Sequence, residues 1–125
     1  MTTADDFAEH VARVRARFAS TLNDKIALSF AELEQMAGGG AQAAETVIVT
    51  HRRLHEICGI APTLGFAETG KAAGVARTAV REAAKSKRPP TPEEIAALRS
   101  ALEQMREAAA ADLKDFSDGG KPNAP

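Results

Sequence analysis

A chain of 125 residues is long enough to form one domain around a single hydrophobic core without disulfides or metals. Alanine, leucine, glutamate and arginine are abundant while tyrosine and tryptophan are absent, and this composition favours helices. The 16 basic residues almost balance the 17 acidic ones, which argues against nucleic acid or an anionic membrane as a partner.

The single cysteine and the acidic N-terminal segment favour a cytoplasmic location. Cys58 is the one cysteine, so no internal disulfide can form, which fits a reducing compartment. The N-terminal segment is acidic where a signal peptide is basic, and no apolar run reaches the length of a membrane span. We therefore expect a soluble cytoplasmic protein.

Apolar spacing predicts two helices before the first glycine cluster. The first runs over about 4–19 and ends where Ser20 and Thr21 interrupt the pattern. The second runs over about 22–37 and ends at a turn formed by residues 38–40, all glycine. Each carries an apolar stripe, formed in the first by Phe7, Val11, Val14 and Phe18 and in the second by Leu22, Ile26, Phe30 and Leu33.

Three more helices follow. The third spans about 41–60 and ends before Pro62 and Gly65, and the fourth, rich in alanine, runs from about 65 or 66 to 86. The fifth begins at Thr91 as N-cap, with Glu94 completing a capping box. Its stripe is expected to face a core, although its spacing also fits a coiled-coil dimer seam; it consists of Ile95, Leu98, Leu102, Met105, Ala109 and Phe116.

These segments predict an all-α fold: an antiparallel four-helix bundle with a short additional N-terminal helix packed on it. The single domain is expected to span residues 1–116. Residues 117–125, rich in glycine and proline, are expected to form a disordered tail.

The third helix contains an unusual histidine. Gly59 follows His55 by four residues, so it removes a side chain on the same face, one turn away. At 100° per residue, His55 lies outside the core stripe around Leu54, and His51 lies on the shoulder of that stripe. Three residues fall on the same outer side as His55, namely Ile48, Arg52 and Gly59. Cys58 falls inside the stripe and is expected to be buried.

The pattern H-x-I-x-G-x-x-x-x-L-G-F over residues 55–66, on a helical chain of this size, resembles the histidine-containing phosphotransfer (HPt) domains of bacterial phosphorelays. The motif covers 54–66, and the architecture covers essentially the whole chain. The resemblance implies that His55 accepts a phosphoryl group from the aspartate of a receiver domain in a response regulator or hybrid kinase. It also implies a protein with no ATP-binding or kinase machinery of its own.

An unprotonated imidazole is a nucleophile at neutral pH, and a covalent intermediate divides the transfer into two easier steps. The protein needs no cofactor of its own, because the partner receiver supplies Mg²⁺ and its acidic pocket. We expect a monomer in which Gly65 shapes the site and in which the receiver-docking face is formed by Ala44, Ile48, His51, Arg52, Glu56 and Gly59.

The chain departs from the family pattern at two positions. Many HPt domains carry a lysine three residues after the histidine, where this chain has Cys58, and a small residue seven after it, where this chain has Pro62. The lysine would steady the phosphoryl group. Its role could pass to another positive residue, and the candidates are Arg52, His51 and Lys71.

Other interpretations remain open. His51 could be the acceptor, although the residue four positions after it is His55 and not a glycine, so no gap lies beside its ring. His51 and His55 resemble half of a zinc site, but the H-E-x-x-H order is absent and the sequence places no third ligand, so we expect no metal site. The chain could also be an HPt-shaped adaptor that binds a signalling partner without accepting phosphate, or a scaffold that dimerises through its last helix.

Overall fold

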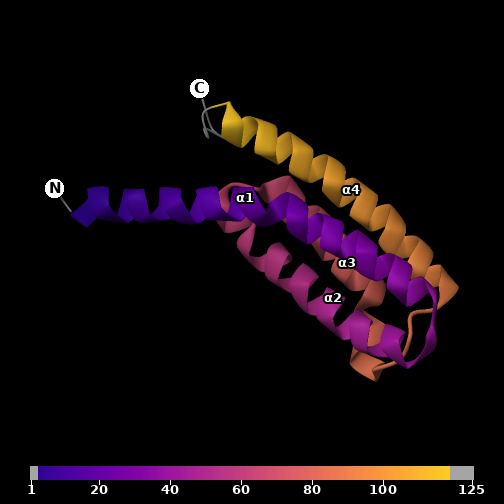
Figure 1. The fold of residues 1–125 in the computed structure, drawn as a ribbon. Helices are drawn as coiled ribbons and strands as arrows, with labels where there is room; N and C mark the ends of the chain where they lie inside the picture. The colour runs from indigo at the N-terminus through magenta and orange to yellow at the C-terminus, as the bar shows by residue number, and fades with distance from the viewer. Residues whose placement is uncertain (1–2, 119–125) are drawn as a thin grey trace.

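The computed structural model describes residues 3–118 and is built from four α-helices (Figure 1). Their bounds are Thr3–Ala37 for α1, Gly40–Ile60 for α2, Ala67–Ser86 for α3 and Pro92–Ser117 for α4. A single turn of 3₁₀ helix, η1 over Pro62–Leu64, joins α2 to α3. No strand occurs within residues 3–118, which confirms the all-helical prediction.

The helices form a bundle in which each contacts its two neighbours. α1 packs against α2 and α4, and α3 packs against the same two helices, while the diagonal pairs do not meet. The short connections make consecutive helices antiparallel (Figure 1). The predicted four-helix bundle is therefore observed.

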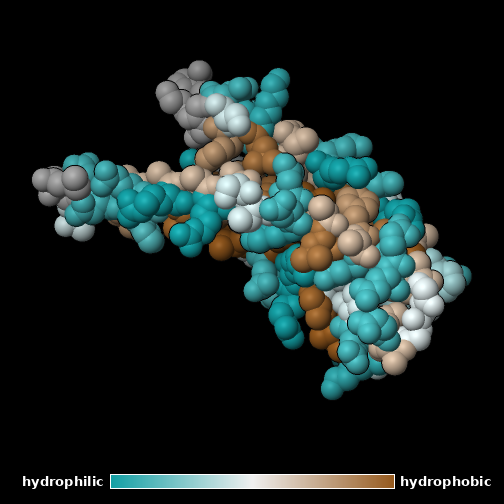
Figure 2. Space-filling view, viewed as in Figure 1, coloured by the Kyte–Doolittle hydropathy of each residue, from teal (hydrophilic) through white to brown (hydrophobic). Residues whose placement is uncertain are grey.

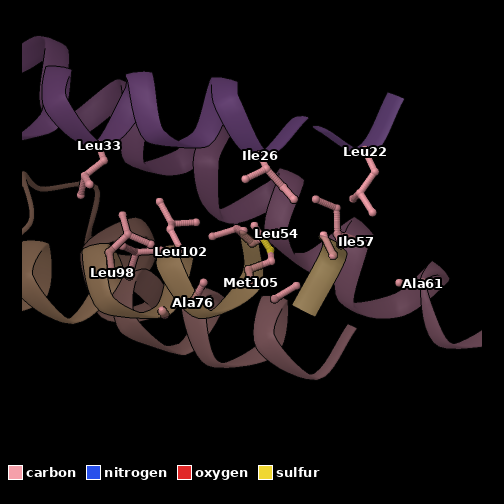
Figure 3. Close-up of a cluster of buried hydrophobic side chains, with 14 of the residues drawn as sticks. Leu22, Ile26, Leu33, Leu54, Ile57, Ala61, Ala76, Leu98, Leu102 and Met105 are labelled. Atoms are coloured by element: carbon pink, nitrogen blue, oxygen red, sulfur yellow. The ribbon is translucent and has the colours of Figure 1, made fainter. Parts of the chain in front are cut away.

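All four helices supply the core. Figure 3 shows side chains from each helix converging on one interior: Leu22, Ile26, Leu33, Leu54, Ile57, Ala61, Ala76, Leu98, Leu102 and Met105. A fully buried leucine of this kind contributes about 2 kcal/mol. α3 contributes mainly alanines, and small side chains let its neighbours approach closely.

The predicted break at Ser20 and Thr21 is wrong, because α1 runs without interruption from Thr3 to Ala37. The Ser20 hydroxyl donates to the carbonyl of Arg17 at 2.8 Å, and the Thr21 hydroxyl donates to that of Phe18 at 3.3 Å. Such hydroxyls bond back to the preceding turn of the helix and leave its backbone ladder intact. The two polar residues therefore lie inside one long helix.

The predicted additional N-terminal helix is also wrong, because its residues are the first half of α1. This half projects beyond the other helices (Figure 1), and its outer end is largely hydrophilic while apolar surface appears where it joins the bundle (Figure 2). Phe7 is 68% exposed, and Phe18 is the first buried residue of the helix. The stripe continues the core pattern, but no other helix is long enough to cover its first two turns.

α4 begins as predicted. The Thr91 hydroxyl accepts from the Glu94 backbone N–H at 3.1 Å, and the Glu94 carboxylate accepts from the Thr91 N–H at 2.8 Å. The stripe of α4 from Leu98 to Ala109 is buried in the bundle, so it is not free to act as a dimer seam. Ser117, the first residue of the predicted tail, is still helical; 119–125 lie outside the described residues.

Glycines with positive φ make two of the three turns between the helices. Gly39 and Gly40, at φ of 75° and 86°, turn the chain between α1 and α2 as predicted. Gly65, at φ of 89°, ends η1 and directs Phe66 into the core, where its ring meets Phe18 edge-on at 5.2 Å between centroids. This turn brings α3 back along α2.

None of the helices within residues 3–118 combines the length and the apolar character needed to cross a bilayer.

Candidate functional site

His55 is exposed on α2, as the helical periodicity predicts. Its neighbours Leu54 and Ile57 are fully buried or nearly so, and they fix the rotation of the helix that turns the imidazole outward. The ring is thus held on a rigid element while remaining open to another molecule.

Gly59 leaves an empty space beside this ring. Apart from its chain neighbours and the backbone of its own helix, a Cβ placed on Gly59 would meet no atom of residues 3–118 within 4 Å, so the gap is open. Gly59 lies in the last turn of α2, so its cost relative to alanine is at most the roughly 1 kcal/mol of a helix interior. No contact within residues 3–118 requires a glycine at this position.

His55 stands between two open hollows on the surface. One, of about 510 Å³, lies toward α1 and η1 and is lined by Phe18, Lys25, Arg53, His55, Glu56, Ile57, Gly59, Ile60 and Thr63. The other, of about 390 Å³, lies toward α3 and is lined by Ile48, His51, Arg52, His55, Arg81, Ala84 and Lys85. Of the residues that line these two hollows, only His55 lines both, so its side chain separates them.

The contact that fixes the ring comes from α3. Arg77 Nη1 lies 3.0 Å from His55 Nδ1. A guanidinium has donors only, so Arg77 donates and Nδ1 accepts. The Arg77 Nε is buried and has no hydrogen-bond partner within residues 3–118, and the side chain forms no ion pair there.

The approach of α3 to α2 explains how Arg77 reaches the ring. A Cβ on Gly74 would lie 3.3 Å from Cys58 Sγ, and one on Gly70 would lie 2.7 Å from two carbons of the Pro62 ring. Glycine at these positions lets the two segments pack closely. Cys58 is half-buried against Gly74, whereas its place in the apolar stripe predicted a buried side chain.

Positive charge gathers on the α3 side of His55. The hollow there is lined by Arg52, Arg81 and Lys85 and by no carboxylate. Burial is the main cause that lowers the pKa of His51 from 6.5, and the positive charges of Arg77, His55 and Arg81 lower it further. Although the whole chain has a net charge of −1, this face is basic.

Arg53 does not add to that charge, because Glu32 of α1 neutralises it. The two side chains form a bidentate pair, in which Arg53 Nη2 lies 3.0 Å from Glu32 Oε2. The Thr50 hydroxyl donates to the same carboxylate at 2.7 Å. This network ties α2 to α1 and fixes the face that carries His55.

Five of the six residues predicted to surround His55 line the same hollows. Ile48, His51 and Arg52 lie on the α3 side, while Glu56 and Gly59 lie on the α1 side, and Ala44 lines neither. Ile48 was expected to be exposed, but it is half-buried because it packs against the hydrophobic core.

Two neighbours of His55 were missed from the sequence, Arg77 and Arg81. The signal was a stripe on α3 at 70, 74, 77 and 81, in which two glycines precede two arginines at helical spacing. Lys71, a predicted substitute for the absent lysine, lies elsewhere: it pairs with Glu68 at 3.6 Å and lines a small hollow between α3 and α4.

No metal centre is visible in the described part of the chain, since no three His, Cys, Asp or Glu side chains there come together in a group able to hold an ion. Searches against protein-family models, curated proteins and solved structures find no match to this chain. The functional interpretation therefore depends on the geometry around His55.

Proposed function

We propose that this chain is a histidine phosphotransfer protein that carries a phosphoryl group between receiver-domain aspartates, with His55 as the acceptor. The observation that carries the proposal is an exposed imidazole on a rigid helix, with the open space of Gly59 on one side and a guanidinium at 3.0 Å on the other. A structural histidine would need neither the space nor the exposure.

The bonds and charges of the transfer balance without any cofactor bound to this chain. The lone pair of an unprotonated ring nitrogen attacks phosphorus, the bond from phosphorus to the aspartyl oxygen breaks, and the receiver keeps its electrons as a carboxylate. The other ring nitrogen carries a proton, so the product is a phosphoimidazolium that can release this proton to solvent. The receiver contributes Mg²⁺, and this chain contributes position and positive charge.

Charge also supports the choice of partner. The active face of a receiver is acidic, and the α3-side hollow offers Arg52, Arg81 and Lys85 without a carboxylate. Complementary charge of this kind accelerates association and selects orientation. Arg52 and Glu56 flank His55 on α2 and would contact the rim of the partner.

Label transfer tests the proposal. The full chain is mixed with purified receiver domains that carry a radiolabelled acyl phosphate, and the labelled protein is treated with acid and with base. We expect acid-labile, base-stable label on the wild type and at least a hundredfold less on His55→Gln, because the substituted amide is not a nucleophile.

His51→Gln is the matched control, since it alters a histidine one turn away on the same helix. Label that persists in His55→Gln and disappears in His51→Gln would assign the phosphate to His51. Circular dichroism of both variants checks that the helices remain.

The adaptor function stays the second candidate because no lysine stands three residues after His55; the half-buried Cys58 occupies that position. An adaptor would bind receivers and take no label. Receiver binding without any acid-labile phosphate would therefore favour the adaptor over phosphotransfer.

A further inference from the structure

We infer that Arg77 is a positioning residue that holds His55 in a non-nucleophilic resting form and moves onto the phosphoryl group when a donor arrives. This inference rests on the proposed function and adds a regulatory step to it. The argument starts from the direction of one hydrogen bond.

The Arg77 contact determines where the proton of the neutral ring lies. Because Arg77 can only donate, His55 Nδ1 must present a lone pair to Nη1, 3.0 Å away. A neutral imidazole carries one N–H, so the proton is on Nε2. In this form neither nitrogen can attack: Nε2 has no free lone pair, and the lone pair of Nδ1 points at the guanidinium.

Nε2 is the nitrogen available to a docked partner, because no residue in the described chain bonds it while Arg77 occupies Nδ1. Attack through Nε2 requires the proton on Nδ1. The exchange is neutral overall: Nε2 loses one proton to water, and Nδ1 gains one. It cannot occur until Arg77 withdraws from Nδ1.

The surroundings of Arg77 favour that withdrawal when an anion approaches. Three other arginines of the fold, Arg53, Arg88 and Arg99, each pair with a glutamate. Arg77 forms no ion pair with a carboxylate within residues 3–118, and its neighbours include Arg81 and His51. A phosphoryl dianion supplies the charge and the acceptor oxygens that this site lacks.

The movement concerns the end of the Arg77 side chain. Its Nε is buried without an acceptor within residues 3–118, so no hydrogen bond of Nε has to break when Nη1 leaves the imidazole. Rotation of that end transfers its donors from Nδ1 to a phosphoryl oxygen on Nε2. Arg77 thereby takes over the role of the lysine that the chain lacks at position 58.

Nitrogen-15 NMR of the histidine rings in the full, unphosphorylated chain at pH 8 tests the resting form without any transfer. His10, exposed on the first half of α1, is the internal reference for a freely exchanging ring. We expect His55 to hold its proton on Nε2 alone, and we expect Arg77→Met to give His55 the averaged signals of His10. Arg81→Met, one turn away, should leave His55 as in the wild type.

The second readout is the lifetime of phosphohistidine formed with phosphoramidate, which needs no receiver. Loss of one charge-assisted hydrogen bond should shorten the half-life about tenfold in Arg77→Met, and Arg77→Lys should restore most of it. A wild-type ring protonated on Nδ1, or an unchanged half-life in Arg77→Met, would overturn the inference. Failure of receivers to label His55 while the NMR result holds would instead overturn the proposed function.

Discussion

His51 shows how one residue can couple the site to pH. Its side chain is half-buried next to Arg77 and Arg81, and burial is the main cause of its lowered pKa. A histidine whose pKa falls on folding binds protons less readily in the folded state than in the unfolded chain. The contribution of His51 to the free energy of unfolding is therefore fully present above pH 6.5, the pKa of the unfolded chain. It is lost as the pH falls from there through the lowered pKa of the folded state.

We expect the free energy of unfolding of the wild type to fall between pH 7.5 and pH 5, and to fall less in His51→Gln. Urea denaturation at several pH values measures both slopes. His10→Gln is the control, because it removes an exposed histidine far from this cluster. Equal slopes for the wild type and His51→Gln would show that burial of His51 does not contribute to the acid sensitivity.

At the scale of the elements, the close packing of α3 against the end of α2 places Arg77 beside His55. Gly70 is the tightest point, because a Cβ there would lie 2.7 Å from the rigid ring of Pro62. Alanine would gain about 1 kcal/mol of helix propensity, but overpacking typically costs about 1–3 kcal/mol. The steric term is larger, since a proline ring cannot rotate away.

Gly70→Ala should therefore lower the free energy of unfolding, by up to about 2 kcal/mol. Gly59→Ala is the matched control, because the added Cβ meets no side chain within 4 Å there. It should raise the free energy of unfolding by up to about 1 kcal/mol. Chemical denaturation of both variants compares them. Stabilisation by Gly70→Ala would mean that α3 is free to shift away from Pro62.

The helix boundaries that depend only on residues close in sequence were the ones predicted correctly. The capping box of Thr91 and Glu94 and the glycine turn at 38–40 depend on neighbours in sequence, and both were predicted correctly. The break at Ser20 and Thr21 was wrong because two hydroxyls bonded to the preceding turn, an outcome that residue type alone does not determine.

At the scale of the whole molecule, docking of a receiver requires room next to His55. Filling the space at Gly59 should obstruct a partner without disturbing the fold, because the added atoms point into solvent. We expect Gly59→Glu to weaken receiver binding at least tenfold, about 1.4 kcal/mol. Calorimetry or fluorescence titration with a receiver that binds the wild type measures the change.

Gly59→Gln separates space from charge in the same measurement, since it has nearly the size of glutamate and no charge. Equal weakening by both variants would attribute the effect to the lost space. A larger effect of Gly59→Glu would add repulsion from an acidic partner, and that part should decrease at high salt. Unchanged affinity in both would remove the Gly59 side of His55 from the docking face.

The sequence alone was sufficient for the helical class, the bundle and the outward direction of His55. These follow from the 3.6-residue period of apolar side chains and from caps and glycines, which act over one or two turns. The partly exposed first half of α1 was not predictable in this way, because its apolar stripe looks the same whether or not another helix covers it.

Only the tertiary structure decided which charge meets the imidazole. Arg77 is 22 residues from His55 in the chain, and the two meet because Gly65 reverses the chain and Gly70 and Gly74 let α3 approach α2. The register between two antiparallel helices depends on how both surfaces pack together. No periodicity within either helix contains that information, so the sequence offered Arg52, His51 and Lys71 for this charge and did not indicate Arg77.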